Sequence, residues 1–172
     1  MAETIRDYDD VTQYGLDDDL REEILQKQIE CTFIWSPKTG WPVGVLMTYI
    51  WKDGSFWVSA TSQRKRIAAI KRDPRVSVVV SSYGTDLGPA KGITAKGRAV
   101  IHDDQPTKDW FYPACAAVNI PTAGKLQDAF ARMLDTERRL VIEVKPEMWI
   151  TFDAAKMMQA SIPAWRKMGL LD

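Results

Sequence analysis

The stretch WKDGSFWVSATSQRKRIAAIKRDPRV, residues 51–76, decides the fold that we expect for this chain. Its pair Asp53-Gly54 is typical of the tight turn that joins two antiparallel strands. The strand that follows, residues 55–61, carries bulky side chains on both faces, with Trp57 on one face and its neighbours on the other. Because consecutive side chains of a strand point to opposite sides, we expect both sides of this strand to be covered.

The end of this strand leads into a candidate phosphate-binding segment. Thr61 and Ser62 supply hydroxyl groups, and either one is expected to cap a helix over about residues 64–72. The first amide groups of a helix have no partner within it, and Arg64 and Lys65 add two positive charges at the same place. The spacing alone leaves open the alternative of a basic helix start that only faces solvent.

Outward from this stretch, the chain predicts further strands joined by short turns. The expected strands cover residues 31–36, 43–51, 55–61, 75–82, 93–103 and 140–152, with Gly97 as a bulge and an interruption at Pro146. The remaining expected helices cover about residues 18–29, a segment from Pro106 that Pro113 ends or kinks, and a segment whose apolar face is Leu126, Ala129, Phe130, Met133 and Leu134. We therefore predict a mainly β, α+β protein built on a six-stranded antiparallel barrel, because closure removes exposed edge strands.

The charge of the chain is balanced overall but unevenly distributed. Lys plus Arg and Asp plus Glu both number 23, so no global field attracts nucleic acid or an anionic membrane. Residues 1–30 hold ten acids against three bases, whereas residues 61–75 hold six bases against Asp73. No apolar run approaches the roughly 20 residues that cross a bilayer, so we expect a cytoplasmic protein.

Cysteine and histidine are scarce. The two cysteines, Cys31 and Cys115, cannot make a disulfide framework and lack the spacing of a zinc site, so no metal is expected. His102 is the only histidine in the sequence. We interpret it as an ordinary surface residue, and no catalytic residue is assigned.

The joined pattern resembles a known family. A hairpin that ends in Thr61, then Arg64-Lys65, a helix and the run Arg72–Val76 is similar to the pyridoxamine-5′-phosphate-oxidase-like superfamily of flavin-binding split β-barrels. The deazaflavin-dependent branch is especially similar over residues 53–80. The resemblance covers about residues 30–153, which leaves residues 1–29 as an acidic, mobile leader with a short helix and residues 154–172 as a C-terminal tail.

The resemblance also implies a cofactor site and an assembly. It implies that Arg64 and Lys65 contact the phosphate of FMN or of the deazaflavin coenzyme F-420, with help from Thr61 and Ser62. The residues implied to lie near the ring system are Val45, Leu46, Met47 and Thr48 on one strand and Ser59 and Ala60 on its neighbour. Such sites form between two subunits, so a homodimer is implied. Beyond the phosphate site, Arg66, Lys71, Arg72 and Arg75 are expected to offer cations to the oligoglutamate tail of F-420.

The implied reaction is hydride transfer between the bound cofactor and a flat conjugated small molecule. The C-terminus lacks the Arg and His pattern with which pyridoxamine-5′-phosphate oxidase binds its substrate, so oxidation of vitamin B6 is not expected. A non-catalytic flavin carrier and a haem-handling split barrel remain alternatives. Trp165 and Arg166 in the tail either cover an edge of the cofactor or pack on the surface.

Overall fold

The computed structural model describes residues 10–171, so the predicted leader falls partly outside the described residues. The strands are β1 (Glu30–Trp35), β2 (Val43–Thr48), β3 (Ile50–Lys52), β4 (Ser55–Thr61), β5 (Arg75–Ser81), β6 (Lys91–His102) and β7 (Arg139–Asp153). The helices are η1 (Val11–Tyr14), α1 (Asp18–Lys27), α2 (Lys65–Arg72), α3 (Gln105–Asn119), α4 (Lys125–Leu134) and α5 (Ala154–Lys167). The helices predicted over residues 18–29 and 64–72 are thus confirmed by α1 and α2.

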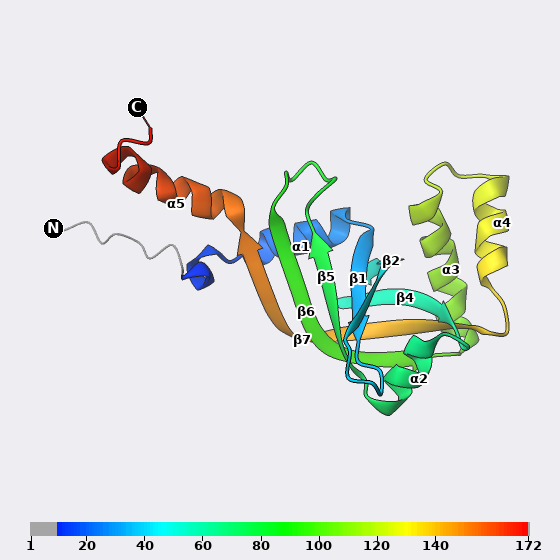
Figure 1. Cartoon of the computed structure of the whole chain (residues 1–172). Coiled ribbons are helices and arrows are strands. Elements are labelled where there is room, and N and C mark those ends of the chain that lie inside the picture. The colour runs from blue at the N-terminus through cyan, green and yellow to red at the C-terminus, as the bar shows by residue number, and fades with distance from the viewer. Residues whose placement is uncertain (1–9, 172) are drawn as a thin grey trace.

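All seven strands form one antiparallel sheet in the order β2-β1-β5-β6-β7-β4-β3. The two outer strands, β2 and β3, follow one another in the chain with Tyr49 alone between them. The two edges of the sheet therefore meet at one residue, and the sheet curls into a split barrel (Figure 1). This confirms the predicted fold class, with seven strands in place of six.

The extra strand arises because the predicted strand over residues 43–51 divides at Tyr49. The Tyr49 amide donates to the carbonyl of Ile29 (3.0 Å), and its hydroxyl donates to the carbonyl of Leu25 in α1 (2.8 Å). Its ring is buried in the core. At these contacts the chain stops pairing with β1 and starts pairing with β4. Hydrophobic alternation along the sequence carries no mark of such a change of partner.

Strand β4 is covered on both faces, as predicted. Phe56, Val58 and Ala60 point into the barrel core, whereas Trp57 packs against a second apolar cluster formed with α3 and α4. The turn before β4 is confirmed as well, because Asp53 and Gly54 both have positive φ angles, 53° and 72°. One side of β4 therefore faces the core and the other faces the helices.

The two longest strands, β6 and β7, carry the predicted irregularity. Their register shifts between Lys96 and Gly97, and a Cβ on Gly97 would lie 2.1 Å from the carbonyl oxygen of Lys145. The expected bulge at Gly97 is therefore confirmed, since only glycine tolerates so close a backbone. Pro146 lies opposite Gly97, and β7 continues through it, so the predicted interruption is a change of register and not a break.

Helices α3 and α4 lie side by side at one end of the sheet, and α5 extends from the end of β7 on the other side (Figure 1).

The prediction that Pro113 ends or kinks its helix is wrong as regards the end, because α3 continues to Asn119. Pro113 and Asp109, whose carbonyl loses its helical donor, are both exposed residues. Helix α4 confirms the second predicted helix, but of its predicted apolar face only Leu134 is buried, whereas Leu126 and Met133 remain 71% and 57% exposed. No helix among residues 10–171 has the length and apolar content to cross a membrane.

Candidate cofactor-binding site

The turn between β4 and α2 positions the basic segment. The Ser62 amide donates to the carbonyl of Arg138 (2.7 Å), and the Arg64 amide donates to the carbonyl of Thr61 (2.9 Å). Helix α2 starts at Lys65 with Arg64 as its N-cap residue, and no side chain caps it. The predicted capping by Thr61 or Ser62 is therefore wrong, because this tight turn places them before the cap position. The start of α2 keeps amide donors without a side-chain acceptor.

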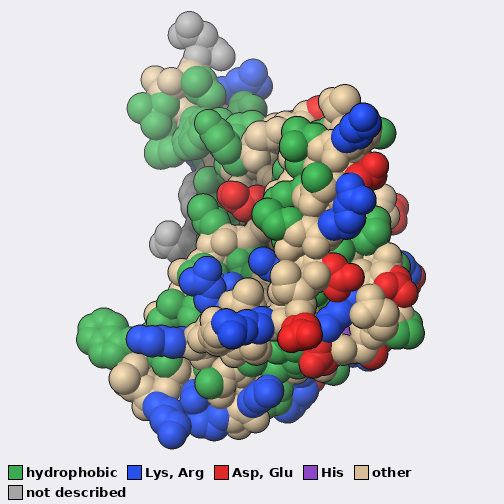
Figure 2. All heavy atoms as spheres, turned by 90° about the vertical axis from the view of Figure 1, so that its right-hand side faces the viewer, with side chains coloured by type: hydrophobic (Ala, Val, Ile, Leu, Met, Phe, Trp, Pro, Cys, Tyr) green, Lys and Arg blue, Asp and Glu red, His purple; other side chains and the backbone are tan. Residues whose placement is uncertain are grey.

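Arg64 and Lys65 are exposed cations at this helix start. Their side chains form no ion pair and no hydrogen bond within residues 10–171. Lys and Arg side chains gather along the lower part of the face shown in Figure 2, at the height where α2 lies in Figure 1. The charge of the segment is thus available to an anion from solvent.

Arg66 is the functional candidate that the sequence prediction assigned only to the tail of F-420. Its Nη1 lies 3.3 Å from the sulfur of Met47 in β2, and its guanidinium lies 5.4 Å from the centre of the Trp35 ring. Its Nε is covered and has no hydrogen-bond partner in the part of the chain that the structure describes. Burial, and then the nearby charge of Arg64, lowers the pKa of Arg66. The signal in the sequence that could have predicted this position of Arg66 is its apolar neighbour Ile67. Ile67 is buried, so this part of α2 faces the sheet.

Strand β2, the strand implied to lie along the ring system, is brought beside α2 by this contact. Val45 and Met47 are half-buried against the barrel core, whereas Leu46 points outward and is 67% exposed. The Thr48 hydroxyl donates to Oδ1 of Asn119 at the end of α3 (3.1 Å). The outer edge of β2 is therefore open between α2 and α3.

Ser59 and Ala60 point to opposite sides of β4. Ala60 is buried in the barrel core, and Ser59 is on the side of the helices, where its hydroxyl accepts a hydrogen bond from Nη1 of Arg139 (3.2 Å). The side chains of Ser59, Thr61 and Arg139 therefore lie on the same side of the sheet. The side chain of Ala60 points to the other side, so only its backbone is near them.

The further cations beyond the helix start are only partly available. Arg75 pairs with Asp73 (Nη2 to Oδ2, 2.7 Å), and its hydrogen bonds lower the pKa of Asp73 to about 2. Arg72 donates to the carbonyl of Ser36 (2.6 Å), while Lys71 is exposed. The expected track for an oligoglutamate tail thus retains Lys71 and the outer part of Arg72.

His102 is not the ordinary surface residue that we predicted. Its Nε2 lies 3.0 Å from Oε2 of the buried Glu143, its Nδ1 lies 3.7 Å from Asp104, and its ring lies 5.3 Å from that of Trp57. Glu143 also accepts a hydrogen bond from the Ser55 hydroxyl (2.9 Å). His102 is thus half-buried outside the barrel core, on the side of the sheet where Trp57 packs against α3 and α4.

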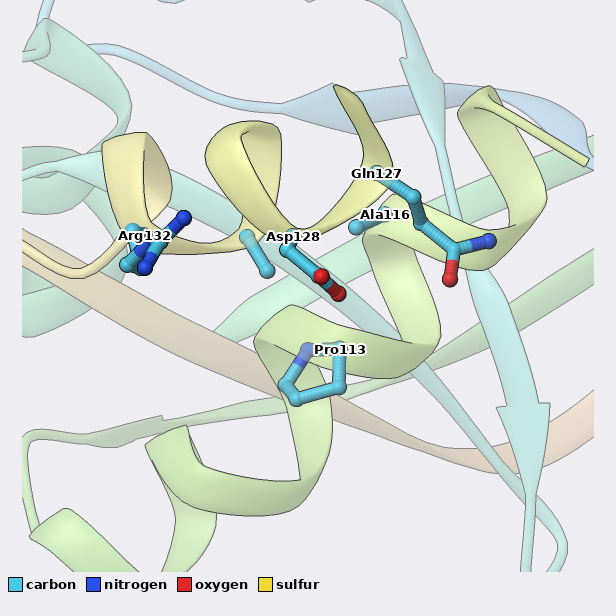
Figure 3. A pocket seen from close by; sticks show the side chains of 6 residues that line it. Pro113, Ala116, Gln127, Asp128 and Arg132 are labelled. Atoms are coloured by element: carbon cyan, nitrogen blue, oxygen red, sulfur yellow. The ribbon is translucent and has the colours of Figure 1, made fainter. Parts of the chain in front are cut away.

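A separate shallow pocket lies between α3 and α4 (Figure 3). Its lining residues are Pro113, Ala116, Gln127, Asp128, Ala131 and Arg132. No residue of the predicted cofactor site belongs to this lining, and its one cation is accompanied by a carboxylate. We therefore assign the candidate cofactor site to the start of α2 and the edge of β2.

This chain has an antiparallel split barrel, and a basic helix start without a side-chain cap lies beside its edge strand. These features are those of the pyridoxamine-5′-phosphate-oxidase-like split barrels. Residues 16–153 match the family model described as pyridoxamine 5′-phosphate oxidase, so the chain belongs to that family. No curated protein matches this chain.

Solved structures share the fold at low sequence identity. The conserved hypothetical protein Rv2991 from Mycobacterium tuberculosis has 15% identity and a TM-score of 0.74, and the match covers 85% of this chain and 90% of that one. An F-420 reductase has 20% identity and a TM-score of 0.59, with 75% and 94% covered. The haem storage protein HutZ from Vibrio cholerae has 13% identity and a TM-score of 0.57, with 78% and 94% covered. These structures support the fold.

Proposed function

We propose that this protein is an oxidoreductase that uses a bound flavin or deazaflavin to transfer a hydride to or from a flat conjugated small molecule. One observation carries the proposal: Arg64, Lys65 and Arg66 are three successive cations at the start of α2 without an acidic partner among residues 10–171, and Arg66 contacts Met47 in the edge strand β2. Family membership supports it, and an F-420 reductase is among the proteins that share the fold.

The donor set suits a cofactor that carries a phosphate on a chain attached to a flat ring. Arg64 supplies a planar fork, Lys65 a point charge, and the first amides of α2 supply neutral donors. The covered Nε of Arg66 has no hydrogen-bond partner among residues 10–171, and an unpaired donor of this kind is stabilised by an added acceptor. The residues present therefore fit FMN and F-420 alike, since both have this phosphate.

When bound, the cofactor supplies the hydride chemistry, and the chain supplies binding and orientation. Arg64 and Lys65 would hold the phosphate, and Thr61 and Ser62 would donate hydroxyls at the end of β4. Arg66 holds α2 against Met47, which positions the phosphate-binding residues relative to β2. The outer edge of β2 would offer a surface to the flat ring.

We also propose that the protein is a homodimer. Strand β2 is an edge strand whose outward Leu46 is 67% exposed, and edge strands of this kind are usually covered in native proteins. A second subunit that covers this edge would exclude water from the ring.

A haem-handling function is less well supported. His102 has a carboxylate facing each ring nitrogen, Glu143 at 3.0 Å and Asp104 at 3.7 Å, so neither nitrogen points at open space as an axial ligand does. Both cysteines are buried.

An absorbance spectrum of the purified protein, followed by titration with FMN, F-420 and haem, tests the proposal. We expect flavin or deazaflavin binding at one site per subunit and turnover of bound cofactor with flat conjugated acceptors. A Soret band with no flavin binding would contradict it. Stoichiometric binding without turnover by any such acceptor would leave a carrier instead of an enzyme.

A further inference from the structure

Arg139 is a half-buried arginine that has no acidic partner among the described residues, 10–171. It begins β7, and its Nη1 donates to the Ser59 hydroxyl (3.2 Å). Its Nε is covered and without a hydrogen-bond partner, and none of the ion pairs found among residues 10–171 includes Arg139. A guanidinium has five N–H donors, and only one hydrogen bond from this side chain is made to the described residues.

A second unpartnered donor is close to it. Tyr112 in α3 is 2% exposed, and its hydroxyl has no hydrogen-bond partner among residues 10–171. Tyr112 belongs to the same apolar cluster as Val141, and Val141 lies two residues after Arg139 in β7, so both point to the same side of that strand. Burial raises the pKa of Tyr112 to about 12. The hydroxyl therefore remains a neutral donor at ordinary pH. Two unpaired donors at one place are rare in folded proteins and indicate a missing acceptor.

The acids around this pair do not supply that acceptor. Asp103 and Asp135 both influence the pKa of Tyr112 through space. Asp103 pairs with Lys108 at 2.6 Å, and Asp135 is exposed at the end of α4. Neither forms an ion pair with Arg139 within the described chain.

We propose that Arg139, Tyr112 and Ser59 form a subsite for a carboxylate on the side of β4 and β7 that α3 covers, and that the substrate is a flat conjugated carboxylic acid. One guanidinium with neutral hydroxyl donors matches a monoanion, and its planar fork matches the two oxygens of a carboxylate. A phosphate dianion is better served by the two cations at the start of α2.

The position of the subsite connects it to the proposed cofactor site. Arg139 is directly opposite Thr61 in the β4–β7 register, and side chains of opposite residues share one side of the sheet. Ser59, its hydrogen-bond partner, is one of the two β4 residues, with Ala60, that the family resemblance implies are near the ring system. A carboxylate held here would therefore lie beside the ring. The assignment of the carboxylate to a substrate rests on the proposed function, whereas the binding of a carboxylate does not.

The test uses benzoate and its neutral analogue benzamide as probes of the purified full chain, with binding measured by calorimetry. We expect benzoate to bind more tightly than benzamide. Arg139→Gln should weaken benzoate binding about 10- to 100-fold, the loss typical of charge-assisted hydrogen bonds, with little effect on benzamide. Tyr112→Phe, which removes only the hydroxyl, should weaken benzoate binding several-fold and remains informative if Arg139→Gln folds poorly.

Arg132→Gln is the matched control, because Arg132 is an exposed arginine in the separate pocket between α3 and α4. It should leave benzoate binding unchanged. Loss of binding in Arg132→Gln but not in Arg139→Gln would overturn the proposal, as would equal affinity of the two probes. Inorganic phosphate that displaces benzoate with greater affinity would overturn the assignment to a carboxylate.

Cofactor titrations separate this subsite from the proposed function. Arg139→Gln should leave the affinity for FMN unchanged, and a loss equal to that of Arg64→Ala would make Arg139 part of the phosphate site and overturn the subsite. If neither FMN nor F-420 binds the wild-type chain while benzoate binding persists, the proposed function fails and the subsite stands.

Discussion

At the scale of single residues, the arginines of this chain differ in what surrounds them. Arg75 is paired with Asp73, Arg64 faces solvent, and Arg66 is held against Met47 and Trp35. The local sequence is basic throughout, so only the contacts distinguish a cation that is already neutralised from one that is available to a ligand. The cofactor prediction therefore depends on Arg64 and Lys65 more than on the total charge of the segment.

We expect Arg64→Ala or Lys65→Ala to weaken FMN binding by about 1.5 to 3 kcal/mol, the usual contribution of a hydrogen bond to a charged group. Riboflavin lacks the phosphate, so its affinity should hardly change. Lys71→Ala, an exposed cation in the last turn of the same helix, is the control and should leave both affinities unchanged. Fluorescence titration measures all of them, and equal losses for FMN and riboflavin would refute the phosphate role.

The pair of Asp73 and Arg75 predicts a stability that depends on pH at the acid end. Hydrogen bonds from Arg75 lower the pKa of Asp73 in the folded protein to about 2, from an ordinary value of 3.8. A carboxyl whose pKa is depressed by folding stabilises the protein above its unfolded pKa, and this stability is lost as the pH falls toward its folded pKa.

Wild type should therefore unfold at a higher temperature than Asp73→Asn above pH 5, and the difference should shrink between about pH 4 and pH 2. The pair is at the surface, so the difference should be small and should decrease with added salt. A difference in unfolding temperature that stays constant from pH 6 to pH 2.5 would show that Asp73 does not act through its charge.

At the scale of elements, the bulge at Gly97 shifts the register of β6 against β7, and a bulge bends the strand that contains it. A Cβ on Gly97 would meet the carbonyl oxygen of Lys145 at 2.1 Å, and a backbone oxygen cannot move away as a flexible side chain can. Gly92 is in the same strand, and a Cβ there would meet no atom within 4 Å. The two glycines therefore form a matched pair.

Gly97→Ala should lower the free energy of unfolding by about 2 to 3 kcal/mol, the usual cost of forced overpacking. Gly92→Ala should change it by less than about 0.5 kcal/mol, as substitutions away from such features do. Urea denaturation monitored by tryptophan fluorescence gives both values. Similar small effects at both positions would mean that the close approach at the bulge relaxes without cost.

At the scale of the whole molecule, the expected assembly is a homodimer that covers β2. Light scattering at micromolar concentration should give twice the mass of one 19.5 kDa chain. Leu46→Asp places a charge on the exposed side of the edge strand and should yield monomers that bind FMN more weakly. Leu126→Asp on α4, which is exposed to a similar degree, should not. A monomeric wild type that binds FMN tightly would refute a site shared between subunits.

The distribution of charge over the molecule predicts how the two cofactors differ. F-420 carries several tail carboxylates that FMN lacks, and the cations left for them beyond the helix start are Lys71 and part of Arg72. Exposed pairs contribute roughly 0 to 1 kcal/mol each and weaken with salt. F-420 affinity should therefore fall more steeply with ionic strength than FMN affinity, and Lys71→Gln should reduce the difference. Equal salt dependence, with FMN much the tighter ligand, would favour an FMN enzyme.

The sequence by itself determined the features that depend on neighbouring residues. The Asp53-Gly54 turn, the two-sided cover of β4, the helix α2 and the glycine bulge at Gly97 each follow from local patterns, because turn chemistry and strand alternation act over a few positions. The family resemblance rested on the same stretch and was confirmed.

The tertiary structure alone decided which distant residues meet. The division of β2 from β3 at Tyr49 coincides with contacts to Leu25 and Ile29, and α3 continues through Pro113 to Asn119. His102 meets Glu143, 41 positions away, and Arg139 meets Ser59, 80 positions away. Such pairings are set by strand order and register, which the chain acquires only when the sheet closes, so no local pattern in the sequence encodes them.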